Sequence, residues 1–218
     1  MNTPGARDTN ASTAPAGSPD PARLQAAREA LAEATAAAQS PKPAVEAAPG
    51  AGDATNAELE GVARARQIAL RQLAMGPRTR QQLRDKLRDR ECSPEAIEQV
   101  LERMSDVGLV DDEAYAHMLV RTKREGSGLA VRGLRHELRK KGVPEHLAEA
   151  AVAEVEPAQE RAQAEALVAA RLPRLHGVDR DVQMRRLGGF LARKGYPAGL
   201  SFSVIRAALD EAPEHVRD

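Results

Sequence analysis

Apolar residues begin to recur with the spacing of one helix face at Leu59. The pair Gly76-Pro77 interrupts this pattern and predicts the end of a first helix. Thr and Gln stand at the two ends of Thr79–Gln82, which is the spacing of a capping box and predicts the start of a second helix. Ser93-Pro94 supplies the cap and the first-turn residue of a third helix. The pattern therefore predicts a unit of three helices.

The stretch Gly108–Ala116 (Gly-Leu-Val-Asp-Asp-Glu-Ala-Tyr-Ala) predicts a joint between this unit and the next. Gly108 can take the left-handed conformation that ends a helix. Either Asp111 or Asp112 can cap the following helix, because carboxylates suit the positive end of a helix dipole. Tyr115 begins a new apolar face. The residues with this predicted structural role are Gly108, Leu109, Asp111, Asp112, Tyr115 and Ala116.

The three-helix pattern then returns twice. Leu134 follows Leu83 by 51 residues within a matching leucine spacing. A Lys-Gly-apolar-Pro turn at 141–144 recurs 53 residues later at 194–197. A unit this small cannot bury its apolar face alone, so neighbouring units must stack. We predict an all-α fold of three tandem three-helix repeats forming an elongated, curved solenoid, with further structural positions at Leu138, Gly142 and Gly195.

The N-terminal segment differs in composition from these repeats. It is rich in Ala, Pro and Gly and has no large aliphatic residue between Leu31 and Val45. Such a segment cannot bury enough apolar area to offset its ordering entropy, so it is predicted to be disordered. The predicted domains are a disordered tail (1–58), three repeats (59–107, 108–156 and 157–213) and a C-terminal tail (214–218).

Composition limits the cellular setting. A single cysteine, Cys92, excludes an internal disulfide and fits a reducing compartment. The N-terminus shows no secretory pattern, and no apolar run approaches 18 residues. We therefore expect a cytoplasmic, monomeric protein without a membrane partner.

Charge is segregated by helix, although the net charge is zero. Residues 64–90 and 121–141 are basic, residues 95–113 and 145–165 are acidic, and 171–194 are basic again. A strip of cations repeated along the solenoid would suit a long polyanionic or acidic partner. The alternative is that neighbouring repeats pair these charges in surface salt bridges, each contributing about 0–1 kcal/mol. We call the candidate contact residues the basic strip: Arg80, Arg84, Arg88, Arg132, Arg135, Arg139, Lys140, Lys141, Arg185, Arg186, Arg193 and Lys194.

In the basic strip, Arg84 and Arg135 lie off the leucine face and are expected to be exposed, as are Arg88, Arg132 and Arg139.

Catalytic and metal-binding patterns are not visible. The histidines (His117, His136, His146, His176 and His215) lack paired ligand spacing and are expected at the surface. Cys92 occupies an apolar turn position, which favours a buried structural thiol. The aromatic residues are expected in core or turn positions, so base-stacking platforms are not supported; these residues are Tyr115, Phe190, Tyr196 and Phe202. We expect neither an enzyme nor a cofactor.

Three motifs carry a family resemblance. They are Leu70-(x2)-Leu73-(x4)-Arg78-Thr79-(x2)-Gln82-Leu83-(x3)-Leu87, Gly108-Leu109-Val110-Asp111-Asp112-(x2)-Tyr115-Ala116 and Glu137-Leu138-Arg139-Lys140-Lys141-Gly142-Val143. Over residues 62–212 the chain resembles the RecX family of recombination regulators. Arg90-Glu91-Cys92 replaces the family's usual Lys-Gly-Phe turn, which predicts a looser turn in the first repeat.

This resemblance implies a regulator without catalytic activity. RecX-like proteins bind the RecA recombinase filament on single-stranded DNA, inhibit its recombinase and ATPase activities, and moderate homologous recombination and the DNA-damage (SOS) response. DNA itself would be bound indirectly or weakly. Two alternatives stay open: a helix-turn-helix-type module that binds DNA through phosphate contacts, and a solenoid adaptor that grips an acidic protein.

Overall fold

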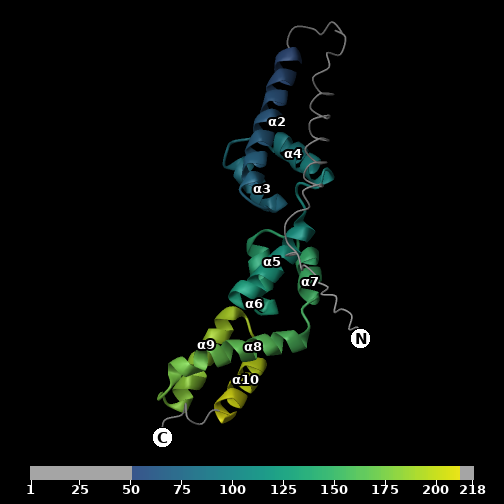
Figure 1. The fold of residues 1–218 in the computed structure, drawn as a ribbon. Coiled ribbons are helices and arrows are strands. Elements are labelled where there is room, and N and C mark those ends of the chain that lie inside the picture. The colour runs from purple at the N-terminus through teal and green to yellow at the C-terminus, as the bar shows by residue number, and fades with distance from the viewer. Residues whose placement is uncertain (1–50, 212–218) are drawn as a thin grey trace, which may run out of the picture. The chain divides into compact units, whose positions relative to one another are not determined.

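The computed structural model describes residues 51–211 and the side chains of residues 56–211. Its helices are α2 (Ala51–Ala74), α3 (Arg80–Arg88), α4 (Pro94–Asp106), α5 (Asp112–Ser127), α6 (Val131–Lys140), α7 (Glu145–Ala153), α8 (Pro157–Arg171), the short 3₁₀ helix η1 (Leu172–Leu175), α9 (Arg180–Lys194) and α10 (Ala198–Glu211). In Figure 1 they form three groups in chain order, α2–α4, α5–α7 and α8–α10. The all-α fold of three tandem three-helix repeats is confirmed.

The first helix begins earlier than the sequence pattern indicated. The predicted tail ended at residue 58, but α2 starts at Ala51, so that boundary was placed too late. Residues 51–58 include alanine and glutamate, which are good helix formers, and extending a helix already held by packing costs little. The rest of the predicted tail and the predicted C-terminal tail lie outside the described residues.

Each repeat is built around its own aliphatic core. The middle helices α3, α6 and α9 each place two leucines at i and i+4 toward this core. All six side chains are at most 1% exposed: Leu83, Leu87, Leu134, Leu138, Leu187 and Leu191. Because the same two positions are buried in all three repeats, the leucine spacing correctly identified the inner face of each middle helix.

The predicted caps of the first repeat are present. The Thr79 hydroxyl accepts a hydrogen bond from the Gln82 backbone N–H (3.1 Å), and the Gln82 side chain accepts one from the Thr79 backbone N–H (3.2 Å). Ser93 accepts from the backbone N–H of Ala96 at 3.2 Å. Helix starts in this repeat therefore follow directly from local sequence.

The joint between the first two repeats resolves the choice between its aspartates. Asp111 caps its own helix α5, because its Oδ1 accepts from the backbone N–H of Ala114 at 2.8 Å. Asp112 Oδ1 accepts from the backbone N–H of Arg80 at 2.8 Å, at the start of α3 in the preceding repeat. The two adjacent carboxylates thus cap two different helices.

A contact that we call the seam connects the first repeat to the second. The Thr79 hydroxyl donates to the Lys141 carbonyl at 2.7 Å, and Thr79 is fully buried. Gly142 follows with a φ of +75° and lies against Gln81, so closely that an added Cβ would be 2.5 Å from the Gln81 Cβ. The Lys-Gly turn therefore ends a helix and also packs on the start of the preceding middle helix.

The same seam recurs between the second and third repeats. The backbone N–H of Ala130 donates to the Lys194 carbonyl at 3.0 Å. Gly195 has a φ of +92°, and an added Cβ would lie 2.3 Å from the backbone nitrogen of Gly133. Glu160 of α8 accepts from the backbone N–H of Val131 at 2.9 Å, as Asp112 does for α3. A carboxylate from the following repeat thus completes the start of each of these two middle helices.

Tyr196 adds a buried polar contact to the second seam. Its hydroxyl donates to the Gly128 carbonyl at 3.3 Å. Burial raises the pKa of Tyr196 to about 12, and the nearby Glu160 carboxylate adds to the rise. The phenol therefore stays protonated and keeps this hydrogen bond at neutral pH.

In the third repeat, the start of the middle helix α9 is covered by a segment of the same repeat. Gln183 aligns with Ala130 and Thr79 and is fully buried. Its side-chain amide donates to the carbonyls of Leu175 (3.1 Å) and Val178 (2.7 Å), which belong to η1 and the turn after it. The segment that contains η1 thus takes the place that a following repeat takes elsewhere.

The first repeat's turn is not looser than the others, contrary to expectation. The backbone N–H of Cys92 donates to the Leu87 carbonyl at 3.2 Å, as the N–H of Val143 does to the Leu138 carbonyl at 3.1 Å. Glu91 takes the glycine position with a φ of +58°. The Glu91 side chain is exposed, so it clashes with no neighbour. The positive φ still costs free energy through backbone strain.

Two glycines with positive φ should respond differently to alanine. Gly108→Ala should lower the free energy of unfolding by about 1 kcal/mol, from backbone strain alone, because nothing lies within 4 Å of an added Cβ. Gly195→Ala adds a clash with backbone and should cost about twice as much or more. Urea unfolding of both variants measures this difference. Equal losses would contradict the packing role of the Lys-Gly turn.

Glu91→Gly should stabilise the protein by about 0.5–1 kcal/mol, because glycine adopts a φ of +58° without strain. The gain is measured as a shift of the urea midpoint at unchanged slope. Glu95→Gly, at an exposed helical position nearby, is the control and should destabilise.

Candidate partner-binding surface

Three arginines of the basic strip are held in ion pairs. In the first repeat, Arg84 contacts Glu98 of α4 through two hydrogen bonds of 2.8 and 2.9 Å, and Arg80 contacts the same carboxylate at 3.1 Å. In the second repeat, Arg135 contacts Glu149 of α7 at 2.7 and 2.9 Å. These arginines are partly neutralised before any partner arrives.

These ion pairs correct two expectations. We expected Arg84 and Arg135 to be exposed, and the alternative to a free basic strip was that charges pair between neighbouring repeats. Both arginines are instead partly buried, and each pair joins the middle and closing helices of the same repeat. A position beside the leucine face points toward the closing helix, where a glutamate 14 residues later is within reach.

The Glu98 carboxylate is strongly affected by its partners. Its hydrogen bonds to Arg84 and Arg80 lower its pKa to about 2, against a smaller opposing effect of burial. Glu98 therefore remains ionised at all physiological pH values, and this pair persists there.

Lys141 and Lys194 are both components of the seams. Both are partly buried, and both contribute their carbonyls to the contact with the preceding repeat. The Lys194 ammonium also donates to the Ser127 carbonyl and lies 5.1 Å from the centre of the Phe190 ring. The carbonyls of both lysines and the ammonium of Lys194 are thus engaged in structural contacts.

The remaining members of the basic strip are exposed, and within residues 51–211 none of them forms an ion pair. They are Arg88, Arg132, Arg139, Lys140, Arg185, Arg186 and Arg193. The structure thus leaves a smaller set of cations than the charge pattern suggested, drawn from all three middle helices.

The third repeat gathers arginines around a cavity of about 380 Å³. No acidic side chain lines this cavity, whose residues are Arg171, Arg174, Leu175, Arg185, Arg186, Gly189 and Arg193. Arg171 also lies 4.6 Å from the centre of the Phe190 ring, a cation–π distance. The cavity can accept an anionic group, since several guanidinium groups converge without a carboxylate.

The basic strip does not include Arg171 and Arg174. They belong to the end of α8 and to η1, whereas the strip was drawn from the middle helices. The only available signal was the basic character of 171–194, which does not tell which cations converge.

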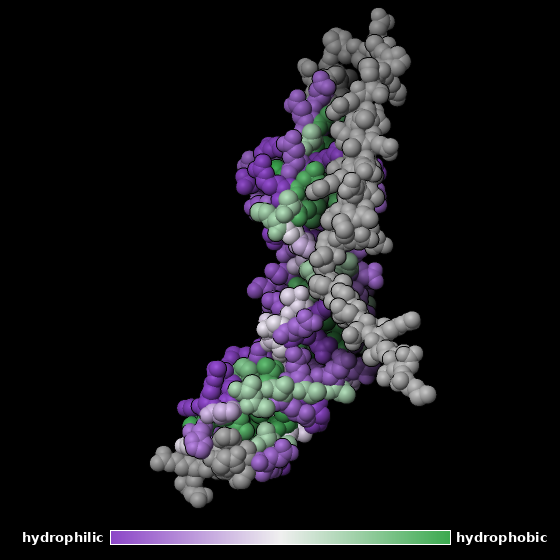
Figure 2. All heavy atoms as spheres, viewed as in Figure 1, coloured by the Kyte–Doolittle hydropathy of each residue, from purple (hydrophilic) through white to green (hydrophobic). Residues whose placement is uncertain are grey.

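Phe202 is a further correction. We expected the aromatic residues in core or turn positions, and Tyr115 and Tyr196 are indeed buried. Phe202 is 62% exposed on α10. Figure 2 shows apolar side chains at the surface of the repeat that contains α9 and α10.

The described residues contain no cluster of three or more potential metal ligands. His117 pairs with Glu154 at 3.2 Å, and His215 lies outside the described part of the chain. Cys92 is a half-buried free thiol that packs against the core of the first repeat. Among residues 51–211, no helix has the length and apolar character that a membrane span requires.

Comparison with known proteins gives one family. Residues 65–104 match the first three-helix domain of RecX, and residues 111–152 match the second. The regulatory protein RecX of Streptomyces lividans is 48% identical over 153 residues, which cover 70% of this chain and 81% of that protein. The RecX protein of Thermobifida fusca is 49% identical over 148 residues, or 68% and 80% of the two chains.

Solved structures support the same fold. The crystal structure of RecX from Lactobacillus salivarius matches with a TM-score of 0.63 at 23% identity, over 70% of this chain and 99% of that one. A second crystal structure of a regulatory protein RecX matches with a TM-score of 0.67, over 74% and 80% of the two chains.

Glu98→Gln should lower the free energy of unfolding near neutral pH by about 0.2–1 kcal/mol, since the pair is solvent-accessible. The folded-state pKa is depressed, so the contribution is present above pH 4.5 and is lost as the pH falls toward 2. Urea unfolding of both proteins between pH 7 and about 2 should show the difference disappear. Glu102→Gln, on the exposed side of α4, is the matched control; a constant difference would contradict the ion-pair explanation.

Proposed function

This chain belongs to the RecX family of regulatory proteins, and from that membership we propose that it binds RecA recombinase filaments on single-stranded DNA. Binding inhibits the recombinase and ATPase activities of RecA and moderates homologous recombination and the SOS response. The protein acts in the cytoplasm as a monomer, without a cofactor.

The observation that carries this proposal is the set of uncompensated cations on three consecutive repeats. Arg88, Arg132 and Arg139 are exposed on the middle helices of the first two repeats, and the arginine-lined cavity lies on the third. A RecA filament on DNA is a long partner that carries many negative charges. Cations distributed over several repeats can contact such a partner at more than one point.

The contact surface that we propose excludes the paired cations. Arg80, Arg84 and Arg135 would have to give up a carboxylate before binding another anion. Free guanidinium groups, by contrast, only exchange water for the partner. The exposed cations listed above, together with Arg171 and Arg174, are therefore the candidate contacts.

A second candidate function is direct DNA binding through phosphate contacts. The cavity of the third repeat favours it, because several arginines surround a space without any carboxylate. Binding through Z phosphates would give a slope of about −0.9Z in a plot of log K against log salt for duplex DNA. A filament inhibitor should instead need RecA for tight binding, which separates the two functions.

The test of the main proposal is the DNA-dependent ATPase activity of RecA on preformed filaments. The protein is titrated well below one molecule per RecA protomer. We expect a strong fall in ATPase rate, because one bound molecule can block growth of a filament or break it. An unchanged rate, together with DNA binding in the absence of RecA, would favour the second candidate.

Charge reversal in the third repeat should abolish most of this inhibition. The variant Arg174→Glu/Arg186→Glu/Arg193→Glu changes exposed side chains, so helicity and thermal unfolding should stay close to those of the unaltered protein. We expect at least a tenfold, or about 1.4 kcal/mol, weaker inhibition constant. The control Arg84→Gln/Arg135→Gln removes two paired cations and should leave inhibition within about twofold. Equal effects in both variants would contradict the distinction between paired and free cations.

A further inference from the structure

The ion pair of the first two repeats is absent from the third, because both of its positions have changed. Arg84 and Arg135 align with Gly188, while Glu98 and Glu149 align with Phe202. At these two positions the third repeat has a glycine on α9 and an aromatic ring on α10, where the other repeats have an Arg–Glu salt bridge. Its own salt bridge between these helices lies elsewhere, between Arg180 and Asp210.

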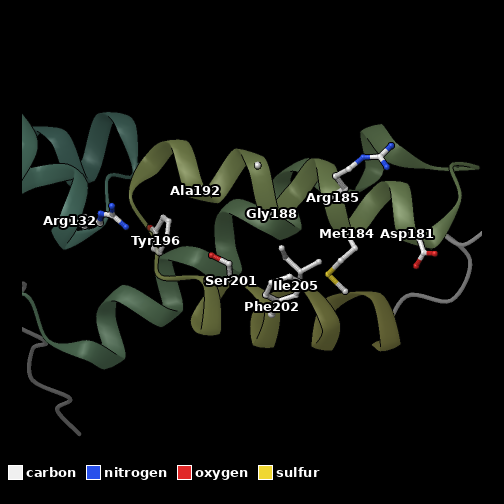
Figure 3. Close-up of a pocket in the computed structure, with 12 residues that line it drawn as sticks. Arg132, Asp181, Met184, Arg185, Gly188, Ala192, Tyr196, Ser201, Phe202 and Ile205 are labelled. Atoms are coloured by element: carbon white, nitrogen blue, oxygen red, sulfur yellow. The ribbon is translucent and has the colours of Figure 1, made fainter.

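This change opens a groove between α9 and α10 with a volume of about 580 Å³ (Figure 3). An added Cβ at Gly188 would meet nothing within 4 Å, so the groove reaches the backbone of α9. Phe202, Met184 and Ile205 lie between the two helices in Figure 3. The apolar part of the lining consists of Met184, Gly188, Gly189, Ala192, Phe202 and Ile205.

No neighbour among the described residues requires a glycine at position 188, because nothing lies within 4 Å of an added Cβ there. Gly188 and Gly189 lie in the middle of α9, where glycine weakens a helix relative to alanine. Gly188 and Ala192 are four residues apart on one helix face, a spacing of small residues that lets another backbone approach closely. The surface is therefore shaped for contact with a second chain.

One polar atom in the groove lacks a partner. Ser201, one of the residues that line the groove, is 4% exposed, and its buried Oγ forms no hydrogen bond. A buried hydroxyl without a partner is costly, so an occupant that uncovers it would gain by bonding to it. Figure 3 shows the Ser201 hydroxyl between α9 and α10, close to Tyr196.

The charged lining differs between the two ends of the groove. Arg132 lies beside Tyr196 at one end, whereas the Arg185 side chain points away from α10 (Figure 3). Asp181 at the other end is the one acidic residue of the lining. The occupant should therefore carry apolar side chains for the centre and a carboxylate for the end near Arg132.

We propose that this groove binds a short amphipathic segment of a protein partner, with apolar anchors and a flanking acidic residue. The inference rests on the function proposed above, so the partner is the recombinase in its filament. The groove supplies an apolar anchor, whereas the exposed cations supply long-range attraction. The apolar contribution of the groove to the binding free energy should therefore not weaken as salt is added.

The test restores in the third repeat the ion pair of the other two. Gly188→Arg/Phe202→Glu should close the groove without changing the net charge. The fold should also be unchanged, because the Arg84–Glu98 pair occupies the same positions in the first repeat. Binding of the fluorescently labelled full chain to RecA filaments on single-stranded DNA should weaken by about tenfold or more, at low and at high salt. The control Ala166→Arg/Ala207→Glu places the same two residues at exposed positions outside the groove and should bind normally.

A second variant guards against misfolding of the first. Phe202→Ser removes the exposed ring and should also weaken binding, with the circular dichroism spectrum unchanged. Normal filament binding by a folded double variant would overturn the groove as docking site. Loss of binding to single-stranded DNA alone would assign the groove to nucleic acid and equally overturn the proposal. If the unaltered chain fails to bind filaments, the proposed function is wrong. The recombinase is then also wrong as the occupant of the groove.

Discussion

The contact between a Lys-Gly turn and the start of the preceding middle helix is the interaction on which the repeats depend. A backbone carbonyl of the turn, from Lys141 or Lys194, accepts a hydrogen bond from the preceding repeat. The glycine that follows leaves no room for a Cβ, so the two backbones approach closely. Asp112 and Glu160 then cap the same helix starts. Backbone groups that would be unsatisfied in an isolated unit are thus satisfied by its neighbour.

The arginines and lysines fall into two classes, paired and unpaired, with different consequences. Arginines beside the closing helix, such as Arg84 and Arg135, are paired within their repeat and stabilise it modestly. Cations on the outer faces have no such partner among residues 51–211 and are available for binding. The third repeat lacks the pair at this position, since Gly188 and Phe202 replace it, and its middle and closing helices are joined by Arg180 and Asp210 instead. Its surface therefore combines free arginines with an apolar groove.

Local features of the fold could be predicted from sequence, whereas features that join distant residues could not. The capping box at Thr79 and the leucine faces depend on residues three or four positions apart, so periodicity reveals them. The second role of Thr79, as a donor to Lys141, involves a partner 62 residues away. The candidate site shows the same limit. The charge pattern indicated which helices are basic, but only the packing of α3 on α4 shows that Arg84 is neutralised by Glu98.

Gln183 has a consequence for the length of the array. A protein built from identical seams could in principle add further repeats. The Lys-Gly turn of each new repeat would pack on the start of the middle helix of the repeat before it. Here the buried amide of Gln183 is bonded to the segment around η1, and that segment covers the surface. At the opposite end, the turn at Glu91 carries a side chain where a seam requires glycine. The outer surfaces of the first and third repeats thus lack the features that the two seams within residues 51–211 use.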